Sequence, residues 1–173
     1  SVADVLEANF AERHRFEFKA MKSNALELRL QPAKTRVAVF GSFYRGFFVL
    51  SELLSGTISK KVDVDGVATD DATKSYVSPQ KRMWQYPHSL AEEEMVSALA
   101  EKMGVEVFKG RVKTDGFYEL MEQAWNPDLC IMATFGQKID ERLFSWPKLG
   151  FFNLHPCIDD RWPSAYAGPN PFR

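Results

Sequence analysis

The chain has few of the residues from which metal centres and disulfide frameworks are built. Its 173 residues include only two cysteines and three histidines. Two cysteines do not make the disulfide framework of a small secreted domain, and the histidines lack the spacing of metal ligands. We therefore expect no bound metal. We also expect Cys130, in an apolar run, and Cys157, in a loop, to be reduced thiols.

Long apolar runs and an excess of one charge are also absent. No apolar segment approaches the length of a membrane-spanning helix, and the N-terminal residues show no signal-peptide pattern. The net charge is −1 and no basic run occurs, whereas a nucleic-acid footprint is basic. A hydrophobic content of 45% with 26% charged residues is typical of soluble domains. We expect a cytoplasmic protein that binds neither a membrane nor nucleic acid.

The glycine patterns that hold nucleotide phosphates are missing from the turn at 41–46, which follows the first apolar strand. This turn contains neither G-x-G-x-x-G nor a Walker lysine. Phe43 and Tyr44 are bulky where a phosphate needs small neighbours, which counts against a phosphorylated nucleotide substrate. Arg45 could instead bind a substrate carboxylate through two parallel hydrogen bonds. A solvated arginine on the first turn of a helix is the alternative.

What the sequence does contain is an alternation of short apolar strands with helical segments. By periodicity and apolar runs we expect strands at 36–41, 62–69, 105–112 and 128–134, and helices at 47–54, 90–103 and 114–125. This order predicts a Rossmann-like α/β fold, with helices on both faces of a parallel sheet. We assign residues 1–35 to an N-terminal extension, 36–173 to this domain and 72–88 to a long loop within it.

Local signals mark the ends of two helices. Ser89 can cap the helix at 90–103, with Glu92 as its partner in a capping box. Gly104 is expected to stop that helix, and Gly56 to end the helix at 47–54.

The segment Asn153-Leu154-His155 places an amide and an imidazole two residues apart. In a strand, such residues point to the same face, so Phe152 and Leu154 are expected to point the other way, into a core. Asn153 could donate a hydrogen bond to a developing oxyanion, and His155 could transfer or position a proton. The alternative is a satisfied polar edge without catalytic function.

Four motifs follow one another between residues 135 and 171: Phe-Gly-Gln at 135–137, Pro-Lys-Leu-Gly at 147–150, Asn-Leu-His-Pro at 153–156 and Gly-Pro-Asn-Pro at 168–171. This order resembles the folate-dependent formyltransferases, the family that includes the glycinamide ribonucleotide and methionyl-tRNA formyltransferases. The Rossmann-like pattern extends the resemblance upstream to about Arg36.

The resemblance implies that a formyl group is transferred from 10-formyltetrahydrofolate to an amine. It gives Asn153 the role of oxyanion donor, and His155 that of stabilising the oxyanion or assisting proton movement. It also implies that the pterin lies against the loop after His155 and against the backbone of the segment Phe135, Gly136, Gln137, Lys138 and Ile139.

The chain departs from the family pattern in two places. Residues 157–163 read Cys-Ile-Asp-Asp-Arg-Trp-Pro, where the family usually has a Ser and a Leu-Leu-Pro. The family also has an Asp a few dozen residues after its His, and Asp159 and Asp160 are too close to His155 to replace it. We therefore expect the chain to lack this Asp and the last strands of the domain.

The amine acceptor is suggested by three segments, 41–46, 84–88 and 162–171. They look most like the N5-hydroxyornithine formyltransferases of pyoverdine-type siderophore synthesis, and Arg45 fits an amino-acid carboxylate. A sugar-amine formyltransferase and a methionyl-tRNA formyltransferase stay open as alternatives. So do a hydrolase that releases formate from the same cosubstrate, and a non-catalytic module in which Asn153 and His155 are structural.

Overall fold

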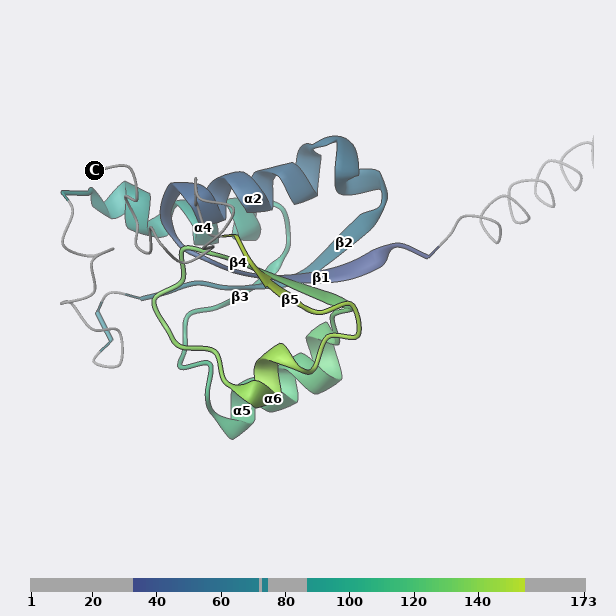
Figure 1. Cartoon of the computed structure of the whole chain (residues 1–173). Coiled ribbons are helices and arrows are strands. Elements are labelled where there is room, and N and C mark those ends of the chain that lie inside the picture. Colours follow the sequence, from purple (N-terminus) through teal and green to yellow (C-terminus); the bar gives the residue numbers. More distant parts are fainter. Residues whose placement is uncertain (1–32, 72, 75–86, 155–173) are drawn as a thin grey trace, which may run out of the picture. The chain divides into compact units, whose positions relative to one another are not determined.

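The computed structural model describes residues 33–71, 73–74 and 87–154, which form a five-stranded sheet flanked by helices (Figure 1). All strand pairs are parallel, in the order β3-β2-β1-β4-β5. The strands are β1 (Thr35–Gly41), β2 (Val62–Ala68), β3 (Glu106–Phe108), β4 (Leu129–Ala133) and β5 (Phe151–Asn153). The predicted Rossmann-like parallel sheet is therefore confirmed.

Helices cover both faces of the sheet, as predicted. In Figure 1, α2 and α4 lie on one side of the strands, and α5 and α6 on the other. The helices are α2 (Phe43–Ser55), α4 (Leu90–Lys102), α5 (Asp115–Glu119) and α6 (Glu141–Phe144). A 3₁₀ turn spans Thr57–Lys60, and a π-helical segment, Leu120–Trp125, continues α5. This arrangement leaves the carboxyl ends of the strands as one common edge.

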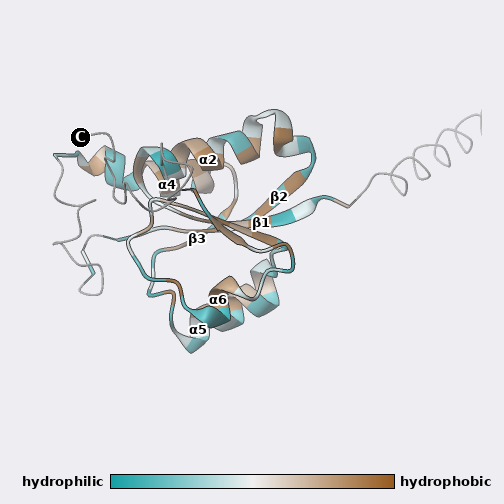
Figure 2. Ribbon diagram, in the orientation of Figure 1, coloured by the Kyte–Doolittle hydropathy of each residue, from teal (hydrophilic) through white to brown (hydrophobic). Residues whose placement is uncertain are grey.

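The central strand β1 supplies side chains to two separate cores. Val37 and Val39 pack with α2 and α4, while Ala38 and Phe40 pack with the segment around α5 and α6. All four side chains are fully buried, and burial of a valine or phenylalanine stabilises the fold by about 1.5–3 kcal/mol each. In Figure 2, hydrophobic residues lie along the strands at the centre, whereas the helices on both sides carry hydrophilic as well as hydrophobic residues.

The capping signals of α4 are confirmed. The Ser89 hydroxyl accepts a hydrogen bond from the Glu92 backbone N–H, and the Ser89 backbone N–H donates to the Glu92 carboxylate. These two bonds satisfy donors that the first helical turn leaves without partners. The helix stops before Gly104, which adopts a φ of 72°. Gly56 also follows the end of its helix, but with an extended backbone rather than a left-handed one.

Two element boundaries were wrong. Helix α2 begins at Phe43 rather than at residue 47, because Phe43 takes a left-handed φ of 56° and the chain enters the helix directly after Ser42. Strand β3 ends at Phe108 instead of reaching residue 112, since the backbone N–H of Val112 donates to a side chain from the loop after β4. The periodicity of the sequence reveals neither the backbone conformation of Phe43 nor the hydrogen bond of Val112.

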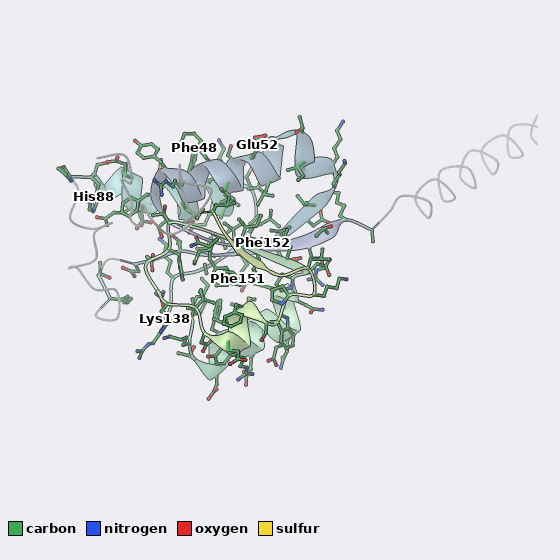
Figure 3. All side chains as sticks on the ribbon, in the orientation of Figure 1. Phe48, Glu52, His88, Lys138, Phe151 and Phe152 are labelled. Carbon is green, nitrogen blue, oxygen red and sulfur yellow. The ribbon has the colours of Figure 1, made fainter. Side chains whose placement is uncertain are left out.

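The prediction that Phe152 and Leu154 enter a core was also wrong. Their exposed fractions are 55% and 50%. Phe151 packs against the core on the side of α5 and α6, and Phe152 points to the other side (Figure 3). There, α2 and α4 bury residues of the other strands, so the helices of that face leave β5 uncovered in the part of the chain that the structure describes.

Candidate functional site at the carboxyl ends of the strands

The sheet has a switch point between β1 and β4. From β1 the chain continues to β2 and then β3 on one side, and later returns to β4 and β5 on the other. In open parallel sheets, ligands bind outside the carboxyl ends of the strands at such a point. Arg45 follows β1, the segment 135–139 follows β4, and Asn153 ends β5. Three groups of predicted site residues therefore lie at the carboxyl ends of three neighbouring strands, β1, β4 and β5.

The turns after β1 and β4 are joined through their backbones. The backbone N–H of Ser42 donates to the carbonyl of Thr134 at 2.8 Å. A Cβ atom on Gly41 would lie 2.8 Å from the Cα of Gly46, and one on Gly46 would lie 2.7 Å from the carbonyl carbon of Gly41. Both glycines are thus needed for α2 to begin so close to its strand.

Two non-glycine residues at this edge have a left-handed backbone. Phe43 has a φ of 56° and Thr134 a φ of 57°. Such a conformation costs about 1–3 kcal/mol for a bulky or branched residue, and it concentrates at functional sites. The surrounding contacts must therefore hold both turns in place.

A buried carboxylate joins the ends of β1, β2 and β4. Asp70 lies two residues after the end of β2 and is 4% exposed. One of its oxygens, Oδ2, accepts hydrogen bonds from the Ser42 hydroxyl, at 3.1 Å, and from the backbone N–H of Gly136. The Ser42 oxygen in turn accepts from the Asp70 backbone N–H, at 3.1 Å. Ser42 occupies the N-cap position of α2, yet its hydroxyl bonds to Asp70 rather than capping the helix.

Sequence reasoning did not select Asp70. The available signal was an acidic residue directly after an apolar strand, at the edge where ligands bind. A buried carboxylate is costly unless hydrogen bonds compensate for the lost water. The hydrogen bonds of Asp70 therefore restrict how the turns after β1, β2 and β4 can be placed relative to one another.

The predicted pterin-binding segment is anchored at both ends by apolar side chains. Phe135 and Ile139 pack against the core on the side of α5, and the ring of Phe135 lies edge-on to Phe40 with the centroids 5.6 Å apart. Lys138 is exposed and points away from the sheet (Figure 3). Packing against the core therefore holds the two ends of the segment in place, while Lys138 between them faces solvent.

Gln137 holds this segment to the loop after β3. Its Nε2 donates to the carbonyl of Gly110 at 3.0 Å, and its Oε1 accepts from the backbone N–H of Val112 at 3.1 Å. Its side chain thus positions a neighbouring loop. Within the described ranges, no hydrogen bond uses the backbone groups of residues 137–139. Those groups can meet a ligand.

Near Arg45, the first turn of α2 meets the start of α4. Arg45 is partly buried. The ring of His88 lies edge-on to Phe43, with centroids 5.1 Å apart, and His88 Nε2 is 2.9 Å from a Glu93 carboxylate oxygen. An imidazole paired with a carboxylate thus lies beside the turn that carries Arg45, a contact that the sequence did not predict.

Asn153 ends the strand next to β4. It stands opposite Met132 in the parallel register, and the next residue, Leu154, donates its backbone N–H to the Met132 carbonyl at 2.8 Å. Asn153 is exposed, as a residue that meets a substrate must be. His155 lies outside the described residues, so its position beside Asn153 stays a prediction. The segments 84–86 and 162–171 also lie outside them.

Three further properties follow from the described ranges. Cys130 is buried, and burial raises the pKa of its thiol to about 12. No three side chains among His, Cys, Asp and Glu come together there as a metal site would need. In the same ranges, none of the helices is both long and apolar enough to cross a membrane.

Comparison with known proteins identifies relatives for part of the chain. No family model matches it. The chain is 39% identical to the methionyl-tRNA formyltransferase of Macrococcus caseolyticus over 64 residues. The match covers 36% of this chain and 20% of that relative. The Synechococcus sp. enzyme of the same name is 35% identical over 71 residues, 40% of this chain and 21% of that one. The Herpetosiphon aurantiacus enzyme, also named methionyl-tRNA formyltransferase, is 29% identical over 76 residues, which cover 44% of this chain and 24% of that enzyme.

These matches support a formyltransferase family for the chain. The chain spans only 20–24% of the length of these three relatives. The matched part of each relative is thus a fraction of an enzyme named methionyl-tRNA formyltransferase.

Proposed function

We propose that this protein transfers the formyl group of 10-formyltetrahydrofolate to an amine. One observation supports this most directly. The family resemblance links residues 135–139 to cosubstrate binding and Asn153 to catalysis. Both lie at the carboxyl ends of neighbouring parallel strands, β4 and β5, next to the switch point. The relatives named as formyltransferases support the same chemistry.

The described residues suit a pterin. A pterin edge carries several hydrogen-bond donors and acceptors, and the backbone of residues 137–139 presents groups of both kinds without hydrogen bonds among the described residues. Packing of Phe135 and Ile139 and the bonds of Gln137 hold that backbone still. A rigid backbone loses little entropy when the ligand binds, which favours affinity.

Asn153 acts where charge develops. Attack of the amine on the formyl carbon forms a C–N bond and moves an electron pair onto the formyl oxygen. The side-chain amide of Asn153 donates a hydrogen bond to that oxygen, and such a donor lowers the barrier because its dipole is oriented in advance. His155 stabilises the oxyanion or takes up the proton that the attacking nitrogen loses. When the C–O double bond forms again, the bond between the formyl carbon and the folate nitrogen breaks, and that nitrogen takes up a proton as tetrahydrofolate leaves.

We propose N5-hydroxyornithine as the amine. Arg45 supports this choice because a guanidinium binds an amino-acid carboxylate through two parallel hydrogen bonds. Arg45 belongs to the first turn of α2, which begins after β1, the strand next to β4. The carboxylate end of the acceptor would then lie near α2, and its hydroxylamine nitrogen would point toward Asn153.

Aminoacyl-tRNA is the second candidate acceptor. The observation that favours it is the name of the relatives, which are methionyl-tRNA formyltransferases. The net charge of −1 does not favour a polyanionic substrate.

The test supplies the full-length protein with 10-formyltetrahydrofolate and, in parallel, N5-hydroxyornithine, methionyl-tRNA, an amino-sugar nucleotide or no acceptor. Tetrahydrofolate release and formylated product are both measured. Transfer to N5-hydroxyornithine alone supports the proposal, and transfer to methionyl-tRNA replaces its acceptor. Formate release without any amine would make the protein a hydrolase. No turnover in any mixture, with folate still bound, would direct the search to other acceptors, whereas no turnover and no folate binding would refute formyl transfer.

A further inference from the structure

We propose that Asp70 is a positioning residue for the cosubstrate, acting through Gly136 on the backbone that follows β4. This inference rests on the proposed function, because it assigns residues 135–139 to 10-formyltetrahydrofolate. Asp70 does not need to touch the ligand. Its carboxylate instead sets where the backbone groups that meet the ligand lie.

The contacts of Asp70 link three loops that are distant in sequence. Oδ2 accepts from the Ser42 hydroxyl after β1 and from the backbone N–H of Gly136 after β4, while Asp70 itself follows β2. The partners are 28 and 66 residues away in the sequence. Hydrogen bonds to a carboxylate are stronger than those between neutral groups. A buried carboxylate with these partners therefore fixes the distance between the two turns of the switch point.

Gly136 is shaped to this carboxylate. A Cβ atom at position 136 would lie 2.7 Å from Asp70 Oδ2 and 2.9 Å from its Cγ. Real Cβ atoms do not approach so closely, so any larger residue would push the carboxylate and the segment apart. The carboxylate at position 70 and the missing side chain at position 136 thus form one fitted contact.

The fitted contact lies next to the backbone that meets the ligand. Thr134, two residues before Gly136, has a left-handed φ of 57°, and a branched residue keeps such a backbone only where its surroundings impose it. Residues 137–139, directly after Gly136, carry the backbone groups proposed for the pterin. If the bond from Gly136 to Asp70 is lost, these groups become less ordered, and affinity for the cosubstrate falls.

The first experiment titrates 10-formyltetrahydrofolate into the full-length protein without an acceptor and measures the dissociation constant by calorimetry. Asp70→Asn and Asp70→Ala are compared with Asp71→Asn. Asp71 is the matched control, because it is the adjacent carboxylate and bonds to the exposed Thr73. Titrations run at a temperature where circular dichroism shows each variant to be fully folded.

We expect Asp70→Ala to raise the dissociation constant about tenfold or more, which corresponds to the loss of one charge-assisted hydrogen bond. Asp70→Asn, which keeps an acceptor oxygen without the charge, should lie between Asp70→Ala and the unchanged protein. Asp71→Asn should bind like the unchanged protein. Equal binding by all variants would overturn the inference. Failure of the unchanged protein to bind the folate would refute the proposed function and this inference with it.

A second set of variants tests the same contact if Asp70→Ala does not fold. Ser42→Ala removes one bond to the carboxylate and should weaken binding less than Asp70→Ala. Gly136→Ala should weaken binding strongly where Asp70 is present. Combined with Asp70→Ala, where the obstructing carboxylate is gone, it should weaken binding no further. Strictly additive effects of the two substitutions, or tight binding by Gly136→Ala alone, would contradict the fitted contact.

Discussion

Gln137 accepts a hydrogen bond from the backbone N–H of Val112 at 3.1 Å and so joins the loop after β4 to the loop after β3. The bond connects residues 25 positions apart. Val112 itself is fully buried. The amide of Gln137 is thus engaged in holding the edge of the sheet together, and its neighbours carry the backbone proposed to bind the cosubstrate.

Replacing Gln137 by leucine should destabilise the protein. The buried N–H of Val112 would lose its partner, which costs about 1–3 kcal/mol. Urea denaturation followed by circular dichroism measures the change in the free energy of unfolding. Lys138→Leu is the matched control, since the Lys138 side chain is exposed and should change that free energy by less than about 0.5 kcal/mol. Equal stability of the two variants would show that the Gln137 bonds do not support the loop.

Two glycines should respond to alanine in opposite directions. A Cβ atom on Gly66, in β2, would overlap the indole ring of Trp125, whereas one on Gly116, in α5, would meet nothing within 4 Å. Gly66→Ala should therefore cost about 1–3 kcal/mol through overpacking. Gly116→Ala should stabilise the protein by about 0.5–1 kcal/mol, since alanine favours a helix. Chemical denaturation of both variants measures these values, and a tolerated Gly66→Ala would contradict the packing of Trp125.

The Cys130 thiol should be unreactive until the protein unfolds. Burial raises its pKa from 9.0 to about 12, so the native protein holds almost no thiolate near pH 8. In a Cys157→Ser variant, labelling by a disulfide reagent at pH 8 should be at least about a hundredfold slower in buffer than in denaturant.

The same shift sets a pH dependence of stability. The folded state binds this proton more tightly than the unfolded state, so the contribution of the thiol to stability is complete below about pH 9. It is lost as the pH rises toward 12. Cys130→Ala should remove this alkaline slope, and a slope that persists unchanged would show that other groups cause it.

Replacement of Arg45 should weaken binding of the acceptor and leave binding of the cosubstrate unchanged. With N5-hydroxyornithine as acceptor, Arg45→Gln should raise the KM for the amine about tenfold or more, because the charge-assisted bonds to its carboxylate are lost. The KM for 10-formyltetrahydrofolate should be unchanged. Steady-state kinetics with each substrate varied in turn distinguishes the two. A change in the KM for the folate alone would place Arg45 in a different role.

Much of the fold could be predicted because it is encoded locally. The apolar strands and the capping box of Ser89 and Glu92 each depend on residues that are close in sequence. The bond from Gly136 to Asp70 spans 66 residues and needs the sheet to form first. The burial of Phe152 was predicted wrongly for a related reason, since alternation separates two faces of a strand but does not show which face is covered.

The central claim is that Asn153 stabilises the oxyanion of a formyl transfer. The most direct test measures kcat of the full-length protein and of Asn153→Ala, with 10-formyltetrahydrofolate and the acceptor that the parallel assay identifies. Because Asn153 is exposed, the variant should fold normally, and the account predicts that its kcat falls about 10²- to 10³-fold, as for other lost oxyanion donors. An Asn153→Ala variant that transfers formyl at the rate of the unchanged protein would contradict the account.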